Sequence, residues 1–187
     1  VDEVLQAVGL PSRLAKVYPH QLSGGQRQRV SIAIAIALKP KVLVADEPTT
    51  ALDVVVQKQI MDLIDSIRSI GTAVIFVTHD IALASERASK MAVMYAGKIV
   101  EFGPADKVVG NPLHPYTKAL LSSVPRLKIR EWPEPIPGVP PDLINPPPGC
   151  RFHPRCPRAM DRCKLGVPPI TEHEVGHYVA CWLYSMR

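Results

Sequence analysis

The sequence of 187 residues contains no long apolar run and no large excess of one charge. Its longest apolar stretch, residues 30–38, includes a serine, whereas a membrane-spanning helix needs about 20 apolar residues. No charged and then apolar segment stands at the start of the given sequence, so we expect no export from the cytosol. Aromatic residues make up only 5% and are not interleaved with basic ones, so nucleic acid is not an expected partner.

Proline and cysteine are scarce in the first part of the chain and concentrated in the second. Residues 1–103 hold 4 of the 20 prolines, no cysteine, and 11 Lys and Arg against 10 Asp and Glu. Residues 104–187 hold 16 prolines, all four cysteines, and 11 Lys and Arg against 7 Asp and Glu. This shift in composition predicts two regions that meet between Gly103 and Pro104.

The first region has the pattern of an α/β fold. Short apolar runs bounded by turn residues predict strands, and longer segments with apolar residues at helical spacing predict helices. The predicted strands are residues 42–45, 73–77, 91–95 and 98–102, and the predicted helices are residues 26–38, 54–70 and 81–89. Ala96-Gly97 predicts a hairpin turn. The alternation favours a largely parallel sheet with crossover helices, covered on both faces.

Four short motifs follow one another in this region. Leu22-Ser23-Gly24-Gly25-Gln26 precedes a helix, and the free N–H groups of a helix start can bind phosphate, although Ser23 could equally be an ordinary N-cap. Asp46 and Glu47 end an apolar strand, where carboxylates suit Mg²⁺ chemistry or are simply solvated. Ala51-Leu52-Asp53 comes next. His79 follows another strand, a position where histidine is more often structural.

Together and in this order, the four motifs resemble those of the ATP-binding subunits of ABC transporters. Residues 22–30 resemble the signature, residues 42–47 the Walker B strand with its glutamate, residues 51–53 the D-loop, and His79 the switch histidine. The resemblance implies the C-terminal part of an ABC-type, RecA-like P-loop NTPase domain that uses ATP and Mg²⁺.

The same resemblance implies a role for each motif residue. Asp46 would hold Mg²⁺ through water, Glu47 would act as general base or position the attacking water, and His79 would contact the γ-phosphate. Asp53 would couple the two sites across a dimer. The signature would contact the ATP held by the opposite subunit, through Ser23, Gly24, Gly25 and Gln26.

One element of the family is absent, because the chain contains no G-x-x-x-x-G-K-[ST] phosphate loop. We therefore expect the chain to be the C-terminal part of a longer protein. The phosphate-loop strand of the family lies between the strands at residues 73–77 and 91–95, so the isolated chain would have a gap in its sheet. We expect these 187 residues alone neither to bind ATP tightly nor to hydrolyse it.

The second region resembles the C-terminal extension of oligopeptide and dipeptide importer ATPases. The resemblance lies in residues 111–125, 136–141 and 146–157, and a similar extension occurs on nickel and some sugar-oligomer importers. It implies a second ATPase subunit, identical or paralogous, membrane permease subunits, indirectly a substrate-binding protein, and a peripheral location on the cytoplasmic face of the membrane. From the residues themselves we expect one helix over 114–124 and an extended, ordered strap over 125–149.

The four cysteines make this second, irregular module a candidate metal centre. Cys150, Cys156, Cys163 and Cys181 are separated by five, six and seventeen residues, with no C-x-x-C pair as in a zinc ribbon. Disulfides are disfavoured in a cytosolic subunit. The irregular spacing suits a [4Fe–4S] cluster, which some relatives hold here. Zinc, with His153, His173 or His177 as further ligands, and free thiols remain alternatives.

The basic residues near the cysteines would offset the negative charge of a thiolate cluster, or would simply form a solvated face. They are Arg151, Arg155, Arg158, Arg162 and Lys164. Two functions compete with that of a peptide importer subunit. The first is a soluble ABC-type ATPase, which the proline-rich tail disfavours. The second is a metal-dependent interaction or sensor module carried on an ABC scaffold.

Overall fold

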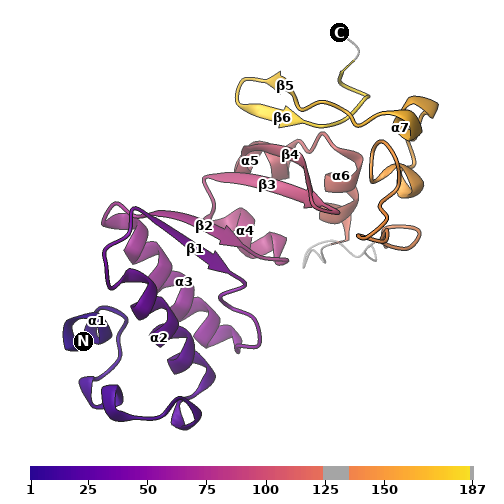
Figure 1. The fold of residues 1–187 in the computed structure, drawn as a ribbon. Helices are drawn as coiled ribbons and strands as arrows, with labels where there is room; N and C mark the ends of the chain where they lie inside the picture. Colours follow the sequence, from indigo (N-terminus) through magenta and orange to yellow (C-terminus); the bar gives the residue numbers. More distant parts are fainter. Residues whose placement is uncertain (124–134, 186–187) are drawn as a thin grey trace, which may run out of the picture. The chain divides into compact units, whose positions relative to one another are not determined.

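A computed structural model describes residues 1–123 and 135–185, which form two compact units, Val1–His79 and Asp80–Arg187 (Figure 1). The first unit contains α1 (Asp2–Ala7), the 3₁₀ turns η1 (Ser12–Lys16) and η2 (Pro19–Gln21), α2 (Gly24–Ile36), β1 (Val42–Asp46), α3 (Val54–Ser69) and β2 (Ala73–Val77). The second contains α4 (Ile81–Arg87), β3 (Lys90–Tyr95), β4 (Lys98–Pro104), α5 (Ala105–Gly110), α6 (Pro115–Ser122), η3 (His153–Arg155), α7 (Asp161–Leu165), β5 (Thr171–Glu174) and β6 (His177–Val179). No helix in the described ranges is long and apolar enough to cross a membrane.

In the first unit, β1 and β2 pair in parallel and α2 and α3 lie beside each other along them (Figure 1). The amphipathic pattern of α3 explains its position, because its apolar stripe is buried, and Asp53 caps its first turn. The buried residues are Ile60, Met61, Leu63, Ile64 and Ile67. The two predicted strands and the helix over residues 54–70 are confirmed within one residue at each end.

One face of this two-stranded sheet carries apolar side chains that stay exposed. Val44 is 61% exposed and Ile75 is 54% exposed, and Val42 and Val77 are similar. The expectation of a sheet covered on both faces is therefore wrong for the described residues. The expectation of a largely parallel sheet is also wrong, since β1–β2 is the sole parallel pair among the strands described. Within those strands, β2 pairs with β1 alone.

In the second unit, four strands form an antiparallel sheet in the order β3-β4-β6-β5. The predicted hairpin at Ala96-Gly97 is confirmed, but the β5–β6 hairpin was not predicted. A cluster of buried side chains from β3, β4, α5 and the cysteine loop forms the core; it comprises Met91, Val93, Tyr95, Val100, Ala105, Val108 and Phe152. Phe152 is only 1% exposed, so the loop between Cys150 and Cys156 shares its core with β3 and β4.

The division into compact units falls after His79. The reason is physical, because β6 adds to β4 and Phe152 enters the core, so residues on both sides of Gly103 share one sheet and one core. The boundary between the two family segments stays a prediction. The helix expected over residues 114–124 is α6, with His114 as its N-cap.

The proline-rich segment has no regular secondary structure over residues 135–149 and is mostly exposed. Arg155 holds its beginning, since its guanidinium donates to the carbonyl of Pro137 at 2.7 Å and to that of Ile136 at 2.9 Å. The rest of the expected strap, residues 125–134, lies outside the described residues.

Candidate functional site

Glu47 and His79 meet at the carboxyl ends of β1 and β2, as the resemblance implies for a hydrolytic site. Parallel pairing places the two ends at one edge, and the N–H of Glu47 extends the ladder to the carbonyl of Val77 at 2.9 Å. The Nδ1 of His79 lies 2.9 Å from both carboxylate oxygens of Glu47. The His79 ring is largely exposed, so both groups remain accessible to a ligand.

The contacts around Glu47 favour its ionised form. Hydrogen bonds from the side chains of His79 and Thr50 lower the pKa of Glu47 below its usual range, and the bond from His79 has the larger effect. Asp46 ends β1 with its side chain exposed, and a carboxylate oxygen is the donor that Mg²⁺ prefers. The pair thus fits an ionised base beside a residue that could hold a metal.

The signature residues at the start of α2 serve two structural purposes. Ser23 is the N-cap of α2, and its hydroxyl accepts from the N–H of Gln26 at 3.3 Å in a capping box. Gly25 packs against α3, because a Cβ there would lie 2.5 Å from the Cγ1 of Val56. The first turn of α2 therefore lies directly against the first turn of α3, which Asp53 caps by accepting from the N–H of Val56 at 2.9 Å.

The four cysteines lie in one neighbourhood of the second unit. The N–H of Cys150 donates to the carbonyl of Cys163 at 2.8 Å, and Gly149 permits this approach because a Cβ there would lie 2.3 Å from the same carbonyl. Cys163 and Cys181 are buried and Cys150 and Cys156 are half-buried, all as free thiols.

The thiols also influence one another electrostatically. Burial raises the pKa of Cys181 to about 11, and the other three thiols add to the shift. Burial likewise raises the pKa of Cys150 and of Cys156. Nevertheless, in the ranges described, no three His, Cys, Asp or Glu side chains converge closely enough to bind a metal ion as they stand.

The basic residues expected to surround the cysteines are mostly engaged elsewhere. The Arg151 guanidinium donates to the carbonyl of Ala96, Arg155 holds the proline-rich segment, and Arg162 stacks on Trp182 at 4.0 Å. Arg158 helps to lower the pKa of Cys156 through its charge. The expectation that the five residues offset the charge of a thiolate cluster stays a prediction.

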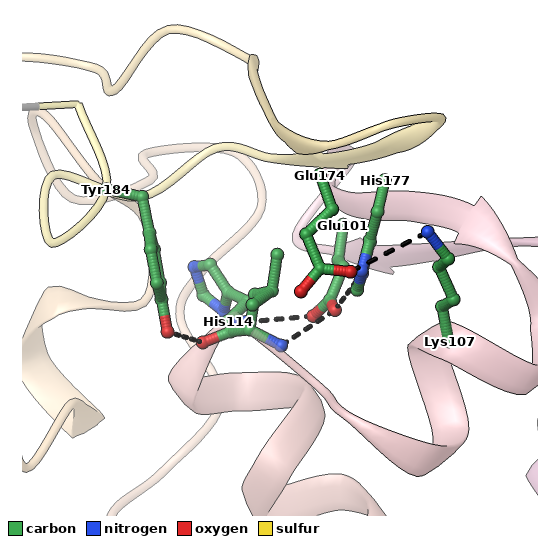
Figure 2. Close-up of polar contacts among 7 residues, drawn as sticks. Glu101, Lys107, His114, Glu174, His177 and Tyr184 are labelled. Atoms are coloured by element: carbon green, nitrogen blue, oxygen red, sulfur yellow. Dashed lines mark hydrogen bonds and ion pairs between the residues drawn. The ribbon is translucent and has the colours of Figure 1, made fainter. Parts of the chain in front are cut away.

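A buried polar network joins β4, the start of α6 and β6 (Figure 2). The Glu101 carboxylate accepts from the N–H of Leu113 at 2.8 Å and from that of His114 at 2.9 Å, and its Oε1 lies 2.8 Å from the Nε2 of His177. Glu101, His114 and His177 are each at most 1% exposed. His177, expected as a spare zinc ligand, is thus committed to Glu101.

Two further contacts lie beside this network. The Tyr184 hydroxyl donates to the carbonyl of Leu113 at 3.1 Å, and the Lys107 ammonium lies 3.6 Å from a carboxylate oxygen of Glu174 (Figure 2). Leu113 also packs with Val179 and Cys181. The start of α6 is therefore fixed by residues from both the sheet and the cysteine-bearing end of the chain.

His114 makes this unit sensitive to mild acid. Its Nδ1 accepts from the N–H of Tyr116 at 3.0 Å, and burial lowers the pKa of His114 to about 4. Between about pH 6.5 and pH 4 the unfolded chain binds a proton at His114 that the folded chain does not, so the stability from this group is full above pH 6.5 and is lost as the pH falls to 4. The loss amounts to about 3 kcal/mol.

We therefore expect the urea midpoint of the full-length protein to fall less steeply between pH 7 and pH 4 in a His114→Asn variant. Asparagine keeps an N-cap acceptor but does not titrate in this range. His20→Asn, at an exposed position, is the matched control and should retain the wild-type pH dependence. Equal slopes for wild type and His114→Asn would contradict the assignment.

Sequence reasoning missed Thr50, Glu101 and the role of His177. Thr50 donates from its hydroxyl to the Oε2 of Glu47 at 2.8 Å. A signal for Glu101 was present, since a single carboxylate stands among the apolar residues of the strand Ile99-Val100-Glu101-Phe102. A charged residue in a strand whose other residues are apolar indicates that the charge has a buried partner.

Comparison with known proteins finds a family match in each region of the chain. A model of the ABC transporter family matches residues 1–50, and a model of the oligopeptide/dipeptide transporter C-terminal region matches residues 100–163. Among solved structures, cbiO1 from Clostridium perfringens, part of the ABC transporter complex cbiONQ, is 33% identical with a TM-score of 0.53. The match covers 59% of this chain and 44% of that one.

Curated relatives match along the whole chain. The dipeptide transport ATP-binding protein DppD of Bacillus subtilis is 48% identical over 100% of this chain and 57% of its own length. The oligopeptide transport ATP-binding protein OppD of Escherichia coli is also 48% identical, over 96% of this chain and 54% of its own. The chain thus spans little more than half the length of these relatives. It is similar along its length to ATP-binding proteins of ABC transporters, and its residues 100–163 match the C-terminal region of the oligopeptide/dipeptide transporter family.

Proposed function

We propose that the chain is part of the ATP-hydrolysing, energy-coupling subunit of an importer for oligopeptides or dipeptides. The observation that carries this proposal is the order of features along one chain. A Glu47–His79 pair at the carboxyl edge of a parallel strand pair comes first, and the peptide-transporter C-terminal region follows. Relatives named for dipeptide and oligopeptide transport match both parts at 48% identity.

The proposed chemistry uses the groups at the ends of β1 and β2. Glu47 is ionised and half-buried, so it can take a proton from, or orient, a water that attacks the terminal phosphate of ATP. His79 holds the carboxylate and presents an exposed ring to the phosphate. The Asp46 carboxylate fits Mg²⁺, which when bound neutralises charge on the phosphates. The signature, Ser23 to Gln26, and Asp53 would act across a dimer of ATPase subunits.

The partners proposed with this function are a second ATPase subunit, membrane permease subunits and, through them, a substrate-binding protein. The subunit would lie at the cytoplasmic face of the membrane. The test uses the full-length protein assembled with its permease in proteoliposomes. We expect ATP turnover that rises with a peptide-loaded binding protein and not with nickel or a sugar oligomer. Turnover that responds to either of those ligands instead would contradict the peptide assignment.

A soluble ABC-type ATPase is the weaker alternative. The match to the oligopeptide/dipeptide transporter C-terminal region over residues 100–163 favours transport, because this region accounts for a third of the chain. If the protein hydrolyses ATP at its full rate without permease, and the addition of permease does not change that rate, the alternative would be favoured.

We further propose that the four cysteines hold a [4Fe–4S] cluster that stabilises the second unit. Four thiols of irregular spacing share one neighbourhood, and two of them are buried, which suits a thiolate-bound cluster. The thiols do not converge as they stand, so binding requires them to move together and to lose their protons. Zinc remains the alternative metal, with His153 and His173 as the histidines not committed to Glu101.

Anaerobic purification of the full-length protein should give a brown protein with about four iron and four acid-labile sulfide per chain. Cys163→Ser should lose the iron and lower the unfolding midpoint, whereas His20→Gln, at an exposed position in the first unit, is the control and should retain both. Zinc at about one per chain would identify the alternative metal. A colourless anaerobic preparation that takes up neither metal on reconstitution would contradict a metal site. Retained assembly and transport in Cys163→Ser, together with a lost response to oxidant, would favour a sensor module.

A further inference from the structure

The turn after β1 brings the hydroxyl of Thr50 back onto Glu47. Glu47 has a φ of 46°, in the left-handed region, and the N–H of Thr50 donates to the Glu47 carbonyl at 3.2 Å. The same turn lets the Thr50 hydroxyl donate to the Oε2 of Glu47 at 2.8 Å. The Glu47 carboxylate thus accepts a hydrogen bond from the Thr50 side chain, which lies in the same turn.

His79 holds the other side of the same carboxylate. Its backbone N–H donates to Oε1 at 3.1 Å, and its ring Nδ1 lies 2.9 Å from each oxygen. The backbone N–H therefore fixes Oε1 and the Thr50 hydroxyl fixes Oε2. Two donors from separate segments thus define the plane of the carboxylate, and loss of the Thr50 hydroxyl would leave Oε2 with the His79 ring as its remaining contact.

We propose that Thr50 is a positioning residue for ATP hydrolysis, whose hydroxyl fixes the plane and rotamer of the Glu47 carboxylate against His79. The proposal rests on the proposed ATPase function. Because a general base must meet the attacking water at hydrogen-bond distance, small errors in its orientation slow the reaction. Thr50 itself need not contact ATP.

The exposure of Thr50 separates this role from a structural one. Its side chain is exposed, whereas the neighbouring Thr49 is buried at 8% exposure. A hydrogen bond in contact with water adds little to the stability of the fold. Thr49 is therefore the threonine expected to matter for folding, and the Thr50 hydroxyl is free to serve the carboxylate.

The test measures steady-state ATP hydrolysis by the full-length protein in its assembled transporter. Thr50→Val keeps the shape of the side chain and removes the hydroxyl, and Thr50→Ser restores the hydroxyl. We expect Thr50→Val to lower kcat about tenfold with an unchanged KM for ATP, and Thr50→Ser to recover most of the rate. An unchanged unfolding midpoint in Thr50→Val would exclude a folding defect as the cause.

Three results would overturn the proposal. They are a wild-type kcat in Thr50→Val, a Thr50→Ser variant as slow as Thr50→Val, and an effect confined to KM, which would mean that Thr50 contacts the nucleotide. Failure of the proposed function has a different signature. A wild-type transporter without ATPase activity overturns the ATPase assignment and the Thr50 proposal together. A Glu47→Gln variant as fast as wild type rules out Glu47 as the base, and with it the Thr50 proposal, but leaves the ATPase assignment standing.

Discussion

Glu47→Gln in the full-length protein is expected to lower ATP turnover by about 10²–10⁴-fold while ATP binding persists. Glutamine keeps the length of the side chain, but its amide cannot accept a proton from water at neutral pH. The amide nitrogen would also face a donor, because the hydroxyl of Thr50 and the N–H of His79 approach the two carboxylate oxygens. Phosphate release and binding of a fluorescent ATP analogue measure the two properties separately.

Glu86→Gln is the matched control for this variant. Glu86 is exposed on α4 and lies 3.8 Å from the guanidinium of its neighbour Arg87, so its replacement should leave turnover at the wild-type rate. Turnover in Glu47→Gln equal to that of the control would rule out Glu47 as the base. Loss of ATP binding together with turnover would indicate that Glu47 acts in nucleotide binding instead.

Glu101→Ala is expected to destabilise the second unit by about 3–5 kcal/mol, a large share of the 5–15 kcal/mol that is typical of a domain. The variant leaves the N–H groups of Leu113 and His114 and the ring of His177 without their acceptor in a region closed to water. Each buried donor without an acceptor costs about 1–3 kcal/mol. Urea unfolding of the full-length protein, followed through the tyrosines of this unit, measures the effect.

Two other variants show whether the buried network is the cause. Glu101→Gln retains one acceptor oxygen, so its loss of stability should be smaller than that of Glu101→Ala. Glu174→Gln removes a carboxylate that is exposed beside Lys107, and such an ion pair contributes about 0–1 kcal/mol. A Glu101→Ala midpoint no lower than that of Glu174→Gln would show that the network does not stabilise the unit.

Elements with a strong local pattern could be predicted from the sequence. β1, β2, the β3–β4 hairpin and α3 carry apolar periods bounded by proline, glycine or an N-cap, and these signals act within the element itself. The resemblance implied separate roles for Glu47 and His79, and parallel pairing of β1 with β2 explains why the two residues meet. These elements follow from local sequence patterns, and the meeting of Glu47 with His79 follows from the sheet edge that β1 and β2 share.

Features that depend on distant partners could not be predicted. β5 and β6 have four and three residues with several polar side chains, and their place in the sheet comes from pairing with β4. The burial of Glu101 depends on His177, which lies 76 residues further along the chain. Thr50 was missed for a local reason. Its hydrogen bond to Glu47 requires the left-handed conformation of Glu47, and no glycine at that position indicates such a turn in the sequence.

The pairing of β4 with β6 also has a consequence for biosynthesis. The hairpin β3–β4 is synthesised well before β6. On the ribosome, one edge of β4 and the Glu101 carboxylate therefore stay unpaired while about 80 further residues are synthesised. At about 5–20 residues per second, this interval lasts several seconds. A nascent chain that stops before His177 would expose an open strand edge, and chaperones or proteases would meet this unit chiefly in that interval.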